Sequence, residues 1–149
     1  MASISRTRTV AAPAAAVWDV LADFGSISSW ADNVDHSCLL QHGDDPAAVG
    51  TTRRVQVGRD TLVERITDSS APTSLRYAIE GLPRQLGRVA NRWTVTPFGE
   101  STAVTLTTTV DIADNPLGRI AEKAACRFMA RQSDTMLAGL AQRVEESHE

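Results

Sequence analysis

The sequence predicts an α+β domain in which a curved antiparallel sheet of seven strands wraps around one long C-terminal helix. From Asn115 to about His148 there is no proline beyond Pro116, and apolar residues return at steps of three, four and seven. They are Leu117, Ile120, Ala121, Ala124, Phe128, Met129, Met136, Leu140 and Val144. This spacing is typical of a helix with one apolar stripe. Six segments between Val34 and Ile112 are rich in β-branched residues and separated by turn residues, which indicates strands. Because a helix of roughly 30 residues cannot bury its stripe alone, the sheet must provide the partner surface.

The first 33 residues predict a strand followed by two short helices. Ser3 to Ala11 is rich in Ser, Thr, Ile and Val, which indicates a strand. Pro13 suits the first turn of a helix, because its missing N–H needs no partner there, and Gly25 suits the end. A second helix or turn follows from Ser26 to Trp30. The apolar face of the first helix would consist of Val17, Leu21 and Phe24, with Trp18 beside it.

The remaining strands follow one another without an intervening helix. Consecutive strands with short connections pair antiparallel, and a sheet of about seven strands curls rather than staying flat. The last helix then fills the concave side, and residues 1–149 form one domain. The predicted strands are Val34–Leu40, Thr51–Val57, Thr61–Asp68, Ser74–Glu80, Arg88–Thr96 and Thr102–Ile112.

Composition argues against several functional classes. The net charge of −3, from 15 basic and 18 acidic side chains, gives no sign of nucleic-acid binding. Cys38 and Cys126 lack metal-ligand spacing, so each is predicted to be a buried thiol. The chain has no phosphate-loop, dinucleotide or zinc motif, so we expect neither metal nor cofactor. It also has no signal peptide or apolar run of membrane-spanning length, so we expect a cytoplasmic protein without integral membrane association, either a monomer or a homodimer.

Strand alternation predicts an ion pair on the inner face of the sheet. A two-residue turn at Arg59-Asp60 would pair Val57 with Leu62, Val55 with Glu64, and Arg53 with Ile66. Arg53 and Glu64 are then diagonal neighbours on the apolar face, close enough for their side chains to touch. Because a buried pair is costly to desolvate, it has either a structural role or a role in orienting the polar end of a ligand.

Further polar and aromatic side chains are predicted to point into the same interior. Together they resemble a ligand pocket with an apolar wall and a few polar anchors, although a polar residue of this kind, taken alone, is more often a hydrogen-bonded core residue than a site residue. They are His36, Tyr77, Asn91, Trp93 and Thr108 on the strands, and Phe128 and Gln132 on the last helix. His36 could also act as a general base. At the pocket mouth, either a movable lid or a plain turn is formed by Gly81, Leu82 and Pro83.

Four stretches, taken in order, resemble the START-like, or SRPBCC, superfamily. This superfamily includes the birch-pollen allergen, the plant abscisic acid receptors and bacterial proteins of the polyketide cyclase/dehydrase type. The resemblance extends over nearly the whole chain. The matching stretches are Ala12-Pro13 with Val17-Trp18, Gly50-x-x-Arg53-x-Val55 with Glu64-Arg65, Tyr77-x-Ile79-x-Gly81-Leu82-Pro83, and Leu117-Gly118-Arg119 through Met129.

The resemblance implies a helix-grip fold with an apolar cavity that binds a small hydrophobic molecule such as a lipid or a polyketide. It also leaves open an enzyme similar to a polyketide cyclase or aromatase. A third alternative is a protein-interaction or toxin-type regulatory module that uses outward-facing arginines of the sheet: Arg54, Arg65, Arg76 and Arg92. The chain departs from the hormone receptors at Gly58-Arg59-Asp60, where the loop is short, which argues against their gating loop.

Overall fold

Seven strands and three helical segments follow one another in the predicted order, in a computed structural model that describes residues 2–82, 87–111 and 116–148. The N-terminal elements are β1 (Ala2–Val10), α1 (Ala14–Ala22) and the 3₁₀ helix η1 (Phe24–Ser29). The next six strands are β2 (His36–Gln41), β3 (Thr52–Val57), β4 (Asp60–Ser70), β5 (Ser74–Glu80), β6 (Arg88–Phe98) and β7 (Ser101–Asp111). The last element is α2 (Pro116–His148). The predicted boundaries Ile112 and Asn115 lie outside the described residues.

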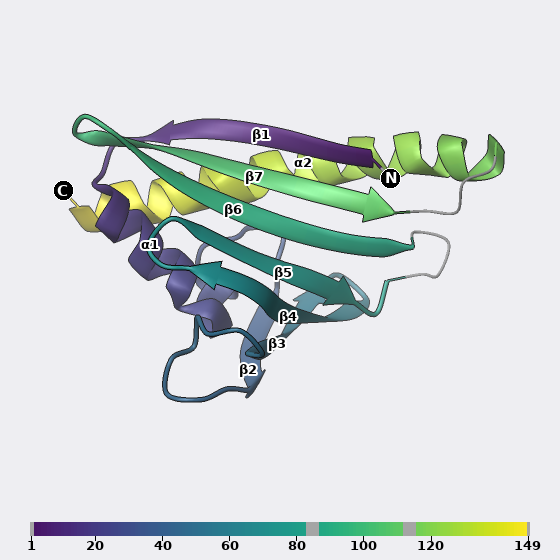
Figure 1. Cartoon of the computed structure of the whole chain (residues 1–149), viewed down its shortest axis with the longest axis horizontal. Helices are drawn as coiled ribbons and strands as arrows, with labels where there is room; N and C mark the ends of the chain where they lie inside the picture. The colour runs from purple at the N-terminus through teal and green to yellow at the C-terminus, as the bar shows by residue number, and fades with distance from the viewer. Residues whose placement is uncertain (1, 83–86, 112–115, 149) are drawn as a thin grey trace.

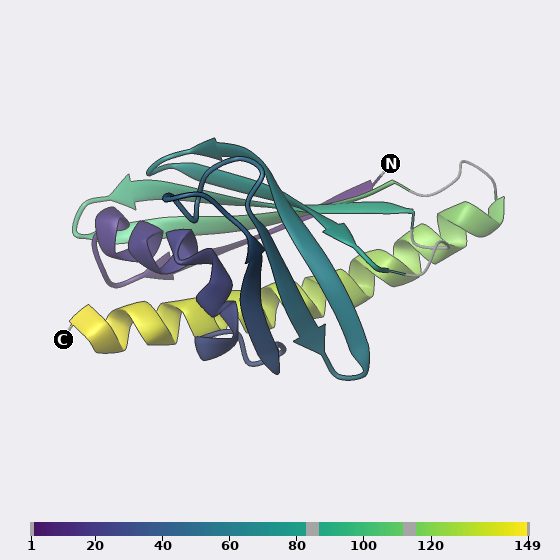
Figure 2. The ribbon, with the colours of Figure 1, turned by 90° about the horizontal axis from the view of Figure 1, so that it is seen from below.

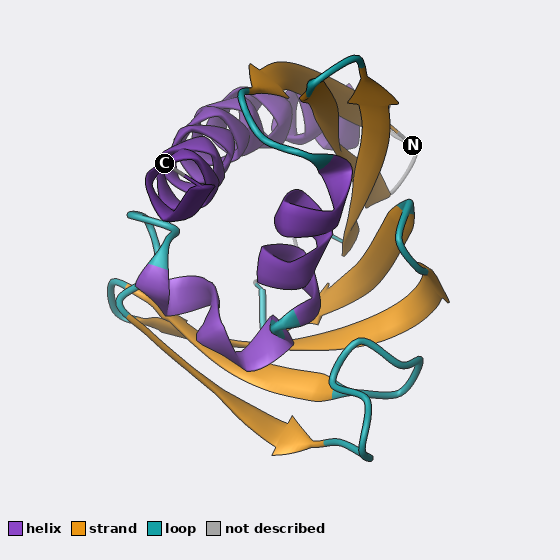
Figure 3. Cartoon of the chain, turned by 90° about the vertical axis from the view of Figure 1, so that its left-hand side faces the viewer, coloured by secondary structure: helices purple, strands orange, loops and turns teal. Residues whose placement is uncertain are grey.

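The strands form one antiparallel sheet in the order β1-β7-β6-β5-β4-β3-β2. Figure 1 shows α2 crossing behind the sheet, and Figure 3 shows the strands curving around α2 and the short helices. Along β7, every second side chain from Thr102 to Val110 is buried, as expected for a strand with one face on the core. The predicted α+β helix-grip fold is therefore confirmed.

The hairpin between β3 and β4 differs in register from the prediction. Its turn lies at Gly58-Arg59 rather than at Arg59-Asp60, and Gly58 has a φ of +60°. A glycine with positive φ at the first central position is typical of a type II′ hairpin turn. Arg53 therefore pairs directly with Glu64 rather than diagonally. Because the pairing moves by two residues, an even number, every side chain stays on its predicted face.

The side chains of the edge strand β2 lie on the faces opposite to those predicted. Ser37 pairs with Val55, whose side chain is buried, so Ser37 and Leu39 face the core. His36 and Cys38 consequently face outward and are exposed. The prediction that Cys38 is a buried thiol is wrong for this reason. Leu39 also precedes a register irregularity in the pairing with β3, which the sequence alone did not reveal.

The described part of α2 buries one side against the sheet and the short helices. Of the predicted stripe, the buried side chains are Met129, Met136, Leu140 and Val144. Phe128 is 54% exposed, Ala124 is exposed and Cys126 is half-buried as a free thiol. The side chains of Leu117, Ile120 and Ala121 lie outside the described residues. Within the described chain, no helix has the length and apolar character needed to cross a bilayer.

The core is concentrated around the C-terminal half of α2. Leu140 and Val144 belong to a large cluster that also includes residues of α1, η1 and the sheet, whereas Met129 belongs to a smaller one with Val89 and Val110. The helix touches the segment after η1 very closely at Gly139, where a Cβ atom would lie 2.0 Å from the carbonyl oxygen of Trp30. Figure 2 shows the N-terminal part of α2 extending past the ends of the strands. The C-terminal half of α2 is therefore the part that packs most closely against the rest of the protein.

Candidate functional site: a cavity between the sheet and the last helix

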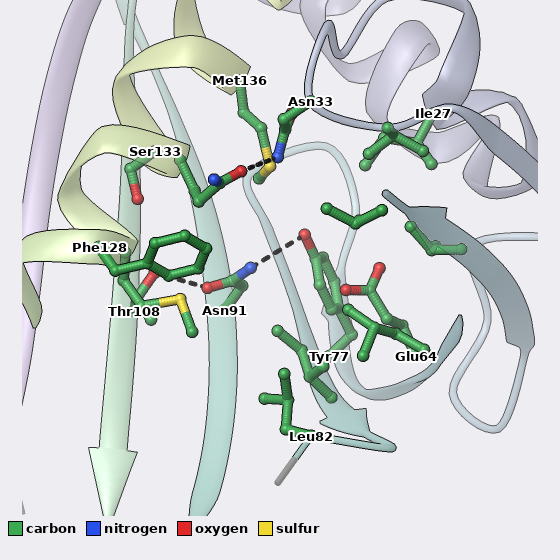
Figure 4. Close-up of a pocket in the computed structure, with 17 residues that line it drawn as sticks. Ile27, Asn33, Glu64, Tyr77, Leu82, Asn91, Thr108, Phe128, Ser133 and Met136 are labelled. Carbon is green, nitrogen blue, oxygen red and sulfur yellow. Dashed lines mark hydrogen bonds between the residues drawn. The ribbon is translucent and has the colours of Figure 1, made fainter. Parts of the chain in front are cut away.

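A cavity lies between the concave face of the sheet and the middle of α2 (Figure 4). The cavity has a volume of about 80 Å³. The wall contains aliphatic side chains from three adjacent strands, namely Val55, Val57, Leu62 and Ile79. The opposite wall comes from α2, through Phe128, Met129, Gln132, Ser133 and Met136. The space is therefore lined mainly by apolar groups, with a few polar ones.

Most of the residues predicted from the sequence line this cavity. They are Val55, Glu64, Tyr77, Asn91, Thr108, Phe128 and Gln132. The structure does not bring His36, Arg53 or Trp93 to the cavity wall. His36 is exposed on the outer side of β2, whereas Arg53 and Trp93 are buried behind the lining residues. A general-base role for His36 at this cavity is therefore not supported by its position.

Arg53 lies behind the cavity wall in a cage of aromatic and polar groups. Its guanidinium carbon is 3.8 Å from the centre of the Phe24 ring and 4.7 Å from that of the Tyr77 ring. Such stacking of a cation on aromatic faces is favourable, particularly away from water. Nη1 donates a hydrogen bond of 2.8 Å to the carbonyl oxygen of Phe24. These contacts hold the charge of Arg53 away from the cavity.

Glu64 connects this cage to the cavity. Its Oε1 accepts a 2.8 Å hydrogen bond from Nε of Arg53 and lies 2.7 Å from Nη2. Both residues are almost completely buried, with exposed fractions of 2% for Arg53 and 5% for Glu64. The described contacts of the carboxylate all fall on Oε1. Because Glu64 also lines the cavity, its second oxygen is the part available to a guest.

A chain of hydrogen bonds runs across three adjacent strands beside the cavity. Thr108 Oγ1 donates to Asn91 Oδ1 over 2.6 Å, and Asn91 Nδ2 donates to the phenol oxygen of Tyr77 over 3.3 Å (Figure 4). Nε1 of Trp93 donates to the same phenol oxygen over 3.2 Å. Because Asn91 and Thr108 are opposite each other in the β6–β7 register, the sheet itself positions these side chains. The chain satisfies polar groups that would otherwise be costly to bury.

The pKa of Tyr77 is raised above its ordinary value of 10.0. The main cause is burial, which disfavours the charged phenolate, and the negative charge of Glu64 acts in the same direction. The positive charge of Arg53 and the hydrogen bonds from Trp93 and Asn91 oppose the rise. Tyr77 is therefore a neutral phenol near pH 7 and can donate a hydrogen bond.

At one end of the cavity, the predicted residue Gln132 has a polar partner that the sequence did not predict. Asn33 Nδ2 donates a 2.5 Å hydrogen bond to Oε1 of Gln132, which connects the segment before β2 to α2. Asn33 Oδ1 is buried and has no partner among the described residues. Ser133 and Ile27 also line the cavity without having been predicted. Asn33 lies in a segment without regular structure, so no alternation pattern could indicate its direction.

The predicted lid is described only in part. Leu82 lines the cavity, and Gly81 has a φ of +95°. A Cβ atom at Gly81 would lie 2.9 Å from the carbonyl oxygen of Thr61, so the close approach to β4 requires glycine here. Pro83 lies outside the described residues, and whether this segment moves stays a prediction.

The outward-facing arginines of the sheet bind mostly to their own neighbours. Arg92 pairs with Asp68 at 3.2 Å, and Arg65 lies 3.9 Å from Glu80. Nη1 of Arg76 donates to Thr67, and Nη2 of Arg54 donates to Gln56. These contacts favour a solvated surface over a docking surface. In the parts of the chain that the structure describes, no three acidic, histidine or cysteine side chains gather as metal ligands would.

Comparison with known proteins assigns the family. The family model described as polyketide cyclase/dehydrase and lipid transport matches residues 1–145. The chain belongs to this family. No curated protein sequence matches it. The superfamily that the sequence motifs resemble is thereby confirmed.

Solved structures share the fold of this polyketide cyclase/dehydrase family member over almost its full length. The Zhui aromatase/cyclase from Streptomyces sp. R1128 is 22% identical, with a TM-score of 0.79 over 97% of this chain and 93% of that chain. A Thermobifida fusca protein is 27% identical, with a TM-score of 0.79 over 98% and 95%. A START superfamily protein from Mycobacterium smegmatis is 16% identical, with a TM-score of 0.78 over 97% of both chains.

Proposed function

We propose that this family member binds a small hydrophobic molecule in the cavity between the sheet and α2. The observation that carries this proposal is the composition of the cavity, whose largely apolar wall is interrupted by the phenol of Tyr77 and the carboxylate of Glu64. Such a wall with a few polar groups is typical of small-molecule sites. Burial of apolar ligand surface would supply most of the affinity, at about 25 cal/mol per Å² before entropic losses.

The size of the cavity limits the guest. Its volume of about 80 Å³ is much smaller than the roughly 300–1,000 Å³ of pockets that hold drug-sized ligands. A guest of about one ring fits inside, whereas a longer molecule extends into the mouth beside Phe128 and Leu82. Phe128, 54% exposed, provides apolar surface there for such a tail.

Native mass spectrometry of gently purified protein tests this proposal directly. We expect a bound molecule that is released on denaturation. A thermal-shift panel of fatty acids, sterols and aromatic polyketides provides the second measurement. A ligand at 100 times its dissociation constant adds about 2.7 kcal/mol to the free energy of unfolding and so raises the Tm. Protein that is always empty and that responds to none of these compounds would contradict the proposal.

A cyclase- or aromatase-like enzyme is the second candidate. It is favoured by the position of a phenol and a carboxylate on the same cavity, because these groups can transfer protons to and from a folded substrate. The raised pKa of Tyr77 keeps the phenol protonated near neutral pH, so in such an enzyme it would act as a hydrogen-bond donor and not as a base. Cyclisation of a polyketide-like chain that is lost in Glu64→Gln or Tyr77→Phe, while binding persists, would favour the enzyme instead.

A further inference from the structure

The charge that faces the cavity is negative. Among the described lining residues, Glu64 is the one carboxylate, and no arginine, lysine or histidine contributes to the wall. Its partner Arg53 is held behind the wall by Phe24 and Tyr77. A guest therefore meets the anionic end of this ion pair, while the cationic end is screened by aromatic rings. Low polarity around the cavity strengthens this effect, because charges interact more strongly there than in water.

Two hydrogen-bonding groups at this place are left for a guest. The described contacts of Glu64 occupy Oε1 and leave Oε2 as an acceptor. The oxygen of Tyr77 accepts from Asn91 and Trp93, so the phenol hydrogen remains as a donor. Tyr77 and Glu64 lie on the neighbouring strands β5 and β4, and Figure 4 shows the two side chains next to each other at the cavity. The pair thus offers one acceptor and one donor.

We propose that the cavity selects a small uncharged molecule with a hydroxyl group and excludes carboxylates, and that Glu64 sets this selectivity. A hydroxyl group can donate to Oε2 of Glu64 and accept from the phenol of Tyr77 at the same time. A carboxylate can only accept, and it would bring a second negative charge next to Glu64 inside an apolar wall. This inference rests on the proposed function, because it assumes that the cavity is a binding site.

Three single-ring probes of similar size separate the possibilities: phenol, toluene and benzoate, each titrated at pH 7 by methyl NMR of the labelled protein. At this pH phenol is neutral and benzoate is an anion. We expect the methyl signals of Val55, Leu62 and Ile79 to shift with phenol at the lowest concentration. Toluene should bind about tenfold more weakly, and benzoate should not bind measurably. Benzoate binding as tightly as phenol would overturn the inference.

The variant Glu64→Gln tests the selectivity-setting residue. Without its carboxylate, Arg53 has an unpaired positive charge, so the ratio of benzoate to phenol affinity should rise by about tenfold or more. The matched control is Glu80→Gln, an exposed carboxylate outside the cavity lining, which should leave the ratio unchanged. If Glu64→Gln does not fold, the double variant Arg53→Met/Glu64→Gln, which removes both charges, should show the same direction of change. An unchanged ratio in the folded variant overturns the inference.

The results also separate this inference from the proposed function. Cavity signals that shift equally with all three probes would support a binding cavity and overturn the selectivity. Cavity signals that shift with none of them, together with an empty protein in native mass spectrometry, would overturn both.

Discussion

Arg53 is held by three kinds of contact at once: an ion pair with Glu64, a hydrogen bond to the carbonyl oxygen of Phe24, and stacking on two aromatic rings. A buried pair of this kind adds little net stability over apolar residues, but breaking it leaves a charge without a partner. The local hydrogen-bond geometry therefore gives the two residues a structural role whatever the cavity binds.

Replacing Arg53 with Met should lower the free energy of unfolding by about 3–5 kcal/mol, because Glu64 is then buried without its partner. Urea unfolding measures this change, and the double variant Arg53→Met/Glu64→Gln should recover a large part of it. Arg65→Met removes the exposed partner of Glu80 and should cost about 1 kcal/mol or less. Equal losses in the buried and the exposed variant would contradict this account.

The chain has one tyrosine, so its ultraviolet titration reports Tyr77 alone. We expect a midpoint above 10.0, since burial and Glu64 raise the pKa in the folded state. Because the folded pKa is above the unfolded one, this stabilising contribution is complete below about pH 10 and is lost as the pH rises through the folded value. The Tyr77→Phe variant should lack this alkaline loss of stability. A midpoint at or below that of the unfolded chain would contradict the assignment.

At the scale of elements, α2 is held closely where Gly139 touches Trp30. In a free helix, alanine is about 1 kcal/mol more favourable than glycine. Here, a Cβ would lie 2.0 Å from a backbone oxygen, so Gly139→Ala should instead destabilise the protein by about 1–3 kcal/mol. Thermal unfolding gives the sign, and Ala138→Gly on the exposed side of α2 provides the control for helix propensity alone. A stabilised Gly139→Ala variant would show that the contact with Trp30 leaves room for a Cβ atom.

The order and type of the elements could be predicted because each has a strong local pattern. Alternation in β7 and the long proline-free helix are clear in the sequence, and both are present. The facing of β2 could not be predicted, because His36, Cys38 and Leu40 alternate with Ser37 and Leu39 without a clear polar side. Only pairing with β3 determines which set is buried.

Prediction of the site succeeded where strand alternation applies and failed elsewhere. Glu64, Tyr77 and Asn91 line the cavity because the register preserved their faces despite the shifted turn. The sequence could not show that Arg53, on the same face, would be covered by Phe24, since that contact joins segments far apart in the chain. Asn33 was missed because it belongs to a loop.

At the scale of the whole molecule, the cavity is space that the protein leaves unfilled between its two largest elements. Val55→Ile should partly fill it, raise the free energy of unfolding by about 0.5–2 kcal/mol and weaken phenol binding. The same change at Val104, which is buried and outside the cavity lining, should destabilise by about 1–3 kcal/mol because no room exists there. Urea unfolding and the NMR titration measure both effects. Equal stability changes at the two positions would indicate that the cavity has no room for an added methyl group.

The bond from the indole of Trp93 to the phenol oxygen of Tyr77 has a practical consequence for experiments. Tyr77 lines the cavity, so a guest can accept a hydrogen bond from its phenol. Such a guest changes the environment of the oxygen to which the indole of Trp93 is hydrogen-bonded. Trp93 is one of three tryptophans, so we expect a change in tryptophan emission when a guest arrives, and we expect this change to be lost in Trp93→Phe.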